Sequence, residues 1–129
     1  MKKQIPMALT VAGAIIAFCG CAELQLDTLE YKRLNQNELE RLFQEDRNVE
    51  FFSSTTRVSV KYFSDGRQEC TWDSGNDKGT YRINNDEFCS TWTWLRQGAE
   101  SCSEIYKISD TEFEFRSADG TPHAVMRLK

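Results

Sequence analysis

The spacing of apolar residues changes once along the chain. Apolar residues recur at helical intervals from Leu39 to Phe43, after an Asn35–Glu38 pair with the spacing of a capping box. This pattern predicts a helix over about 36–45. Beyond it, apolar and polar residues alternate, and turn-forming residues recur about every eight to twelve positions, as in a series of short strands.

The alternating part predicts about eight strands joined by hairpins, of which the Ser64–Arg67 turn is the clearest because Gly66 supplies a positive φ. Such a series has to join or cover its edge strands. We therefore predict a mainly β protein, a small up-and-down antiparallel β-barrel of about eight strands with one N-terminal helix, and a β-sandwich is the alternative. Strands are expected at Val49–Ser53, Val58–Phe63, Gln68–Asp73, Gly79–Ile83, Glu87–Trp94, Cys102–Ile108, around Phe113 and Phe115, and at His123–Leu128, with Ser74–Lys78 as a loop.

The first 20 residues are typical of a secretory signal. Two lysines precede a short apolar run that ends in small residues. The run is shorter than the roughly 20 residues of a membrane-spanning helix, which disfavours a retained anchor. We expect a signal peptide at 1–20, which the resemblance described next implies to be of lipoprotein type, a tether at 21–33 and a β-barrel domain at 34–129.

The Phe18-Cys19-Gly20-Cys21 segment resembles the lipobox of bacterial lipoproteins, in which a small residue precedes a cysteine that is lipidated and becomes the new N-terminus. Gly20 and Cys21 match, whereas Phe18 and Cys19 depart from the usual Leu and Ala or Ser. The resemblance implies lipidation of Cys21, and Ala22 after it implies a place on the periplasmic face of the outer membrane. Cleavage after Ala22, giving a soluble periplasmic or secreted protein, is the alternative.

A second resemblance covers about residues 34–128. It rests on Ser64-Asp65-Gly66, Gly79-Thr80-Tyr81, Phe88-Cys89, Trp92, Cys102 and Tyr106. Their order is similar to that of a group of small secreted or lipidated proteobacterial proteins of unknown function, which are lipocalin-like in outline. The resemblance implies a barrel in the cell envelope and brings no activity with it. Tyr81 stands where Trp is commoner in the group, and Cys70 is additional.

Three of the five cysteines lie in the predicted domain. Cys89 and Cys102 flank one predicted hairpin, so we expect a disulfide between them. Cys70 shares a strand face with Trp72 and is expected to be a small buried apolar residue. The alternative for Cys70 is a reactive thiol, but the single histidine, His123, stands in no recognisable partner motif.

Six aromatic residues are candidates either for lining a pocket or for forming the core. In a barrel of this size they either enclose a small apolar ligand or fill the interior, and the short domain favours a filled core. These residues are Trp72, Phe88, Trp92, Trp94, Phe113 and Phe115.

The formal net charge of -4 over 129 residues argues against nucleic-acid binding, which needs a basic face. Asp77, like the other acids in predicted turns, is expected to be solvated. No phosphate loop, nucleophile elbow or zinc motif is present, so we expect no catalytic residue, metal or cofactor. The expected function is a non-catalytic binding or structural module. Its expected partners are the membrane, through a lipid anchor, and a small apolar ligand or an envelope protein. The alternatives are an inhibitor or docking protein for an envelope hydrolase and, less favoured, a thiol-dependent enzyme.

Overall fold

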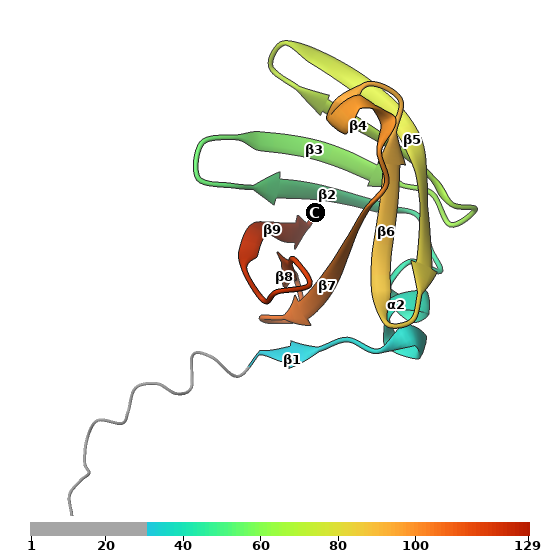
Figure 1. The fold of residues 1–129 in the computed structure, drawn as a ribbon, viewed down its shortest axis with the longest axis vertical. Coiled ribbons are helices and arrows are strands. Elements are labelled where there is room, and N and C mark those ends of the chain that lie inside the picture. The colour runs from blue at the N-terminus through green and yellow to red at the C-terminus, as the bar shows by residue number, and fades with distance from the viewer. Residues whose placement is uncertain (1–30) are drawn as a thin grey trace, which may run out of the picture. The chain divides into compact units, whose positions relative to one another are not determined.

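The computed structural model describes residues 31–129 (Figure 1), and Lys32–Lys129 form one compact unit. The expected signal peptide, the lipidation site at Cys21 and most of the expected tether lie outside the described residues. None of the helices in the described part is both long enough and apolar enough to cross a membrane. The elements are β1 (Lys32–Arg33), α2 (Gln36–Leu42), β2 (Arg47–Phe52), β3 (Arg57–Tyr62), β4 (Arg67–Trp72), β5 (Gly75–Asn84), β6 (Glu87–Trp92), the short turn η4 (Leu95–Gly98), β7 (Ser101–Lys107), β8 (Glu112–Arg116) and β9 (Pro122–Leu128).

Strands β2 to β9 form a closed up-and-down antiparallel barrel (Figure 1). Each strand pairs with the next along the chain, and β9 pairs back onto β2, with Val49 opposite Leu128 and Phe52 opposite Val125. The pairing of the first and last barrel strands removes the edges that an open sheet would expose. The predicted fold is therefore confirmed, with a barrel in place of the alternative sandwich.

The predicted tether over 21–33 is wrong at its end, because Lys32 and Arg33 form β1 and pair with the far end of β7. Strand β6 pairs with β7 only over Phe88–Ser90. Beyond that point β1 occupies the edge of β7 that β6 leaves unpaired. The loop predicted at Ser74–Lys78 is also wrong, since β5 already begins at Gly75.

Helix α2 begins with the capping box that the sequence predicts. The Asn35 side chain accepts a hydrogen bond from the Glu38 backbone N–H, and the Glu38 carboxylate accepts one from the Asn35 N–H, both at 2.9 Å. The helix ends at Leu42, earlier than predicted. Its Leu39, together with Phe43 just after it, is buried, so α2 closes one end of the barrel (Figure 1).

Aromatic rings fill the end of the barrel that α2 closes. The Phe43 ring centroid lies 5.2 Å from that of Tyr62 and 4.9 Å from that of Phe88, and Tyr81 packs against all three. Edge-to-face and tilted arrangements of this kind are the favourable ones for aromatic pairs. At this end of the barrel the expected filled core is present.

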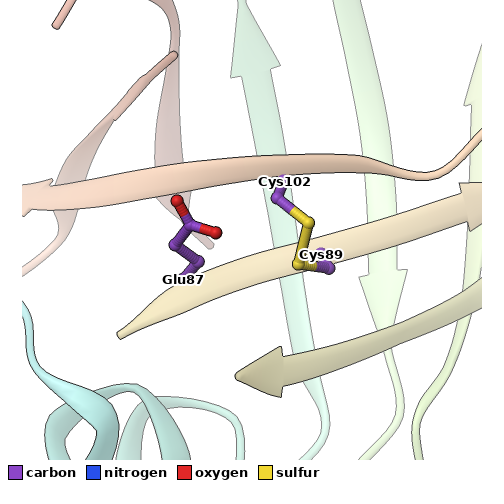
Figure 2. Close-up of side chains that lie close together, drawn as sticks. All are labelled: Glu87, Cys89 and Cys102. Carbon is purple, nitrogen blue, oxygen red and sulfur yellow. A yellow bond between two sulfur atoms is a disulfide. The ribbon is translucent and has the colours of Figure 1, made fainter. Parts of the chain in front are cut away.

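The predicted disulfide between Cys89 and Cys102 is confirmed (Figure 2). The two residues lie directly opposite each other on β6 and β7. In the chain-entropy description, closing a loop of sequence separation 13 stabilises the fold by on the order of 3 kcal/mol. The cross-link ties together the two ends of the segment that carries η4.

Strands β5 and β6 approach most closely at Gly79. A Cβ atom at this position would lie 1.9 Å from the Thr91 carbonyl oxygen, which no side chain can tolerate without backbone movement. Gln68 lies opposite Gly79 on β4 and is buried. Its Nε2 donates to the same Thr91 oxygen at 3.3 Å. Glycine at position 79 therefore lets three strands converge at one carbonyl group.

We expect Gly79→Ala to lower the free energy of unfolding by about 3 kcal/mol or more, because the added methyl group forces β5 away from β6. Urea denaturation followed by circular dichroism measures the change. Gly120→Ala is the matched control: Gly120 has φ +88° and open space around its Cβ position. Its cost should be about 1 kcal/mol, from backbone strain alone. Equal costs for the two variants would contradict the close approach.

Candidate functional site

A cavity of about 210 Å³ lies inside the barrel, under the loop that joins β6 to β7. Tyr62 and Phe88 line it and also pack against Phe43, so they separate the cavity from the filled end. Leu95 and Arg96 of η4 also line it, and because Arg96 is exposed to solvent, η4 lies at the mouth of the cavity. Figure 1 shows η4 and α2 at opposite ends of the barrel. The expected filled core is thus wrong for the η4 end, because α2 supplies large side chains to the other end only.

The cavity has an apolar wall and a polar wall. Strands β2, β3 and β4 contribute the apolar wall, with Phe51, Val58, Val60 and Cys70. The polar wall comes from β6, β7 and β9, and its residues are Ser90, Ser101, Ser103 and His123. Sites for small molecules commonly combine a largely apolar lining with a few polar groups that orient the ligand.

Sequence analysis does not single out the serines of this wall. Ser90 lies between Phe88 and Trp92 on β6, two residues from each, so strand alternation places it on the inward face with them. Ser101 lies opposite Ser90 in register and therefore shares that face. Strand alternation around Ser90 could therefore have predicted a polar group on the inward face of β6.

A β-bulge lies at His123, which lines the cavity and is still exposed to solvent. Phe115 of β8 pairs with Ala124 and Arg116 pairs with Pro122, so His123 is an additional residue on β9. A bulge of this kind re-aims a side chain relative to regular strand alternation. The His123 Nε2 lies 3.1 Å from the Ser103 Oγ, in a hydrogen bond whose donor depends on the imidazole tautomer.

The charge state of His123 follows from its surroundings. Burial lowers the pKa of His123, and the positive charge of Arg96 lowers it further. At neutral pH the imidazole is therefore uncharged. Burial also raises the pKa of Tyr62 far above its ordinary value, so its hydroxyl stays neutral in the cavity wall.

Asp77 holds the loop above the cavity, in contrast to the solvated turn residue that the sequence predicts. It is buried on β5, and its Oδ2 accepts hydrogen bonds from the backbone N–H groups of Trp94 at 2.8 Å and Leu95 at 2.9 Å. Burial of the carboxyl group raises its pKa, but hydrogen bonds from Leu95, Trp94, Lys78 and Thr93 outweigh burial. The pKa of Asp77 consequently lies below its ordinary value, and the carboxylate is ionised.

The loop held by Asp77 is strained where it carries Arg96. Arg96 has φ +54° and Gln97 has φ +56°, both in the left-handed region. For non-glycine residues this conformation costs about 1–2 kcal/mol each. The Arg96 Nη2 donates to the Ser90 Oγ at 3.1 Å. The strained loop thus brings a guanidinium group to the mouth of the cavity.

Three of the six predicted aromatic residues line the cavity: Phe88, Trp92 and Phe115. Phe113 is buried in the core but does not line the cavity. Trp72 is half-buried against the core, and its Nε1 donates to the Ser74 Oγ at 2.9 Å.

The prediction for Trp94 is wrong, because its side chain is 75% exposed. Strand β6 ends at Trp92, two residues earlier than predicted. Trp94 has φ -108° and ψ -44°, which is not extended backbone, so strand alternation no longer places it beside Trp92. Trp94 therefore belongs neither to the core nor to the cavity wall.

Cys70 and His123 line the same cavity, as the thiol-enzyme alternative requires. Cys70 is free and only 2% exposed, and burial raises its thiol pKa to about 11. An activated thiol needs the opposite shift. Among the described residues, no carboxylate forms a hydrogen bond with His123 that would orient it as a base for either Cys70 or Ser103. The geometry of these residues therefore gives no support to nucleophilic catalysis.

The disulfide has one acidic neighbour. The Glu87 carboxylate and the sulfur atoms of Cys89 and Cys102 lie within 4.8 Å of one another (Figure 2). A cysteine binds a metal ion through its thiolate, and here the two sulfur atoms are bonded to each other in the disulfide. In the oxidised protein this cluster therefore offers a single carboxylate, which is not a metal site.

Comparison with protein-family profiles, curated proteins and solved structures finds no match for this chain.

We expect Cys70 to react with iodoacetamide about 100-fold more slowly at pH 8 in the folded protein than in urea, because the raised pKa leaves about 100-fold less thiolate. Mass spectrometry of the tryptic peptide Gln68–Lys78 isolates this cysteine from the others. A folded-state rate near the unfolded one would contradict the raised pKa, and a faster one would indicate an activated thiol and support the enzyme alternative.

Proposed function

We propose that this protein is a non-catalytic binding module that holds a small, largely apolar ligand inside its barrel. The observation that carries the proposal is the cavity of about 210 Å³ under the β6–β7 loop. Aromatic and aliphatic side chains line most of it, and burying a ligand's apolar surface against them contributes about 25 cal/mol per Å² before the cost of association.

The local structure supports a site that exists before the ligand arrives. Helix α2 and the aromatic residues around Phe43 fill only one end of the barrel, so the cavity at the other end remains open. Asp77 and the disulfide hold the loop above the other end. A preformed site loses less conformational freedom on binding than a flexible one.

The alternative, docking to an envelope protein or inhibition of a hydrolase, requires an exposed apolar patch. Among the described residues, Trp94 is the one large hydrophobic side chain that is mostly exposed. A single tryptophan is a contact point rather than a patch, so we favour the ligand-binding role.

We expect 1-octanol to bind in the cavity, and Ala124→Leu to weaken that binding at least tenfold because three added carbon atoms occupy the same space. Ala124 lines the cavity. Fluorescence titration measures the affinity in a Trp72→Phe, Trp94→Phe background, in which Trp92 of the cavity wall is the single emitter.

Val125→Leu is the matched control, because Val125 is the next residue on β9 and lines an outer hollow with Phe52 and Pro122 instead of the cavity. It should leave octanol binding within about twofold of the unchanged protein. Failure of octanol to bind, or equal effects of the two leucine substitutions, would contradict the proposal.

We further propose that the barrel is attached to the cell envelope through a lipid at Cys21. The support is the sequence before the barrel, where a basic start, a short apolar run and a lipobox-like Gly20-Cys21 follow one another. Two acyl chains and a third, amide-linked one would suffice for stable anchoring without a membrane-spanning helix. Membership of the lipocalin-like envelope group is likewise a proposal that rests on the sequence resemblance.

We expect Cys21→Ser to move the protein from the membrane pellet to the soluble periplasmic fraction when it is produced in a Gram-negative bacterium, because the acceptor thiol for the lipid is lost. Cys19→Ser is the control and should stay in the pellet. Unchanged membrane attachment of Cys21→Ser would contradict lipidation at this residue.

A further inference from the structure

The electrostatics of the cavity differ from those of the molecule around it. The chain carries a net charge of -4, yet none of the cavity-lining residues is an aspartate or glutamate. Arg96 carries the one permanent charge of the lining, since His123 is neutral at pH 7. An acidic protein thus presents a cationic group at the mouth of an apolar cavity.

The Arg96 guanidinium has unused hydrogen-bonding capacity. It donates to the Ser90 Oγ, and it forms no ion pair with any carboxylate of the described residues. A guanidinium group has five N–H donors in a planar fork that matches a carboxylate. The Ser101 hydroxyl lies opposite Ser90 in register and lines the cavity beside it. Together, these groups form a donor site next to an apolar space.

The loop geometry indicates that this placement is built into the fold. Arg96 and Gln97 adopt left-handed backbone conformations although neither is a glycine. Asp77 fixes the backbone N–H groups of the two residues before Arg96. Strain of this kind persists when the surrounding structure enforces it, and it concentrates at ligand sites. The strained conformation of the loop therefore fixes the position of Arg96 relative to the cavity.

The volume limits the apolar part of the ligand. An apolar cavity of about 150 Å³ is known to bind benzene, with six carbon atoms. In the same proportion, a cavity of about 210 Å³ accommodates about eight carbon atoms. Longer chains would have to leave part of their length in water.

We propose that the ligand is a short monoanionic amphiphile, a carboxylate with an apolar body of about eight carbon atoms. Its carboxylate binds Arg96 at the mouth, near the Ser90 and Ser101 hydroxyls, and its apolar body packs against Val60, Phe88 and Trp92. This inference rests on the proposed ligand-binding function and adds the chemistry of the head group.

The test compares three unbranched probes that have eight carbon atoms each and different head groups: octanoate, 1-octanol and octylammonium. Trp92 fluorescence in the background described above reports binding. Octanoate should bind about tenfold more tightly than octanol, as expected for a charge-assisted hydrogen bond at a partly solvated site. Octylammonium should bind more weakly than octanol.

Arg96→Gln should weaken octanoate binding about tenfold and octanol binding much less, because a neutral hydroxyl gains less than a carboxylate from a guanidinium group. Arg96→Lys, which retains the charge but loses the fork, should recover part of the difference. Arg41→Gln is the matched control for the loss of one positive charge. Arg41 lies on α2 at the closed end and is exposed. This variant should bind all three probes like the unchanged protein.

Arg96→Gly separates binding from stability, because glycine adopts φ +54° without strain. It should unfold at the same or a higher urea concentration while losing the preference for octanoate. Equal binding of octanoate and octanol, or equal losses of both in Arg96→Gln, would overturn the inference and leave the proposed function intact. Absence of binding for every probe would overturn both.

Discussion

The hydrogen bonds between β2 and β9 are the constraint on which the rest of the molecule depends. They join Val49 and Phe52, near the start of the described chain, to Leu128 and Val125 near its end. Closure brings the apolar wall from β2–β4 opposite the polar wall from β6, β7 and β9. An open sheet with the same strands would expose both walls, and α2 would have no enclosed end to fill.

Local features of the sequence were sufficient to predict the architecture. The capping box at Asn35 and Glu38 involves residues three apart. Strand alternation placed Val58, Val60 and Tyr62 on one face, and all three line the cavity. Hairpin turns determine which strands are neighbours, so about eight alternating strands already indicate a meander that closes.

The features that were missed depend on contacts between distant segments. Asp77 follows Gly75 and Asn76, whose turn-forming character hides the start of β5, and its hydrogen-bond partners lie 17 and 18 residues away. The bulge at His123 exists only in the register between β8 and β9. The cavity itself is a property of how far side chains reach across the interior, which alternation does not specify. For this reason sequence analysis identified Phe88, Trp92 and Phe115 as inward residues but left open whether they fill the interior or line a cavity.

The disulfide has a consequence for how ligand preference could evolve. Its two sulfur atoms bracket a segment that contains Ser90, Arg96 and Ser101, together with Trp92 of the lining, whereas the wall from β2, β3 and β4 lies outside that segment. Substitutions within the bracketed segment can change the chemistry at the mouth while the cross-link maintains the fold. The polar groups of the mouth thus lie on the cross-linked segment, so a change of head-group preference would not require changes in the apolar wall from β2, β3 and β4.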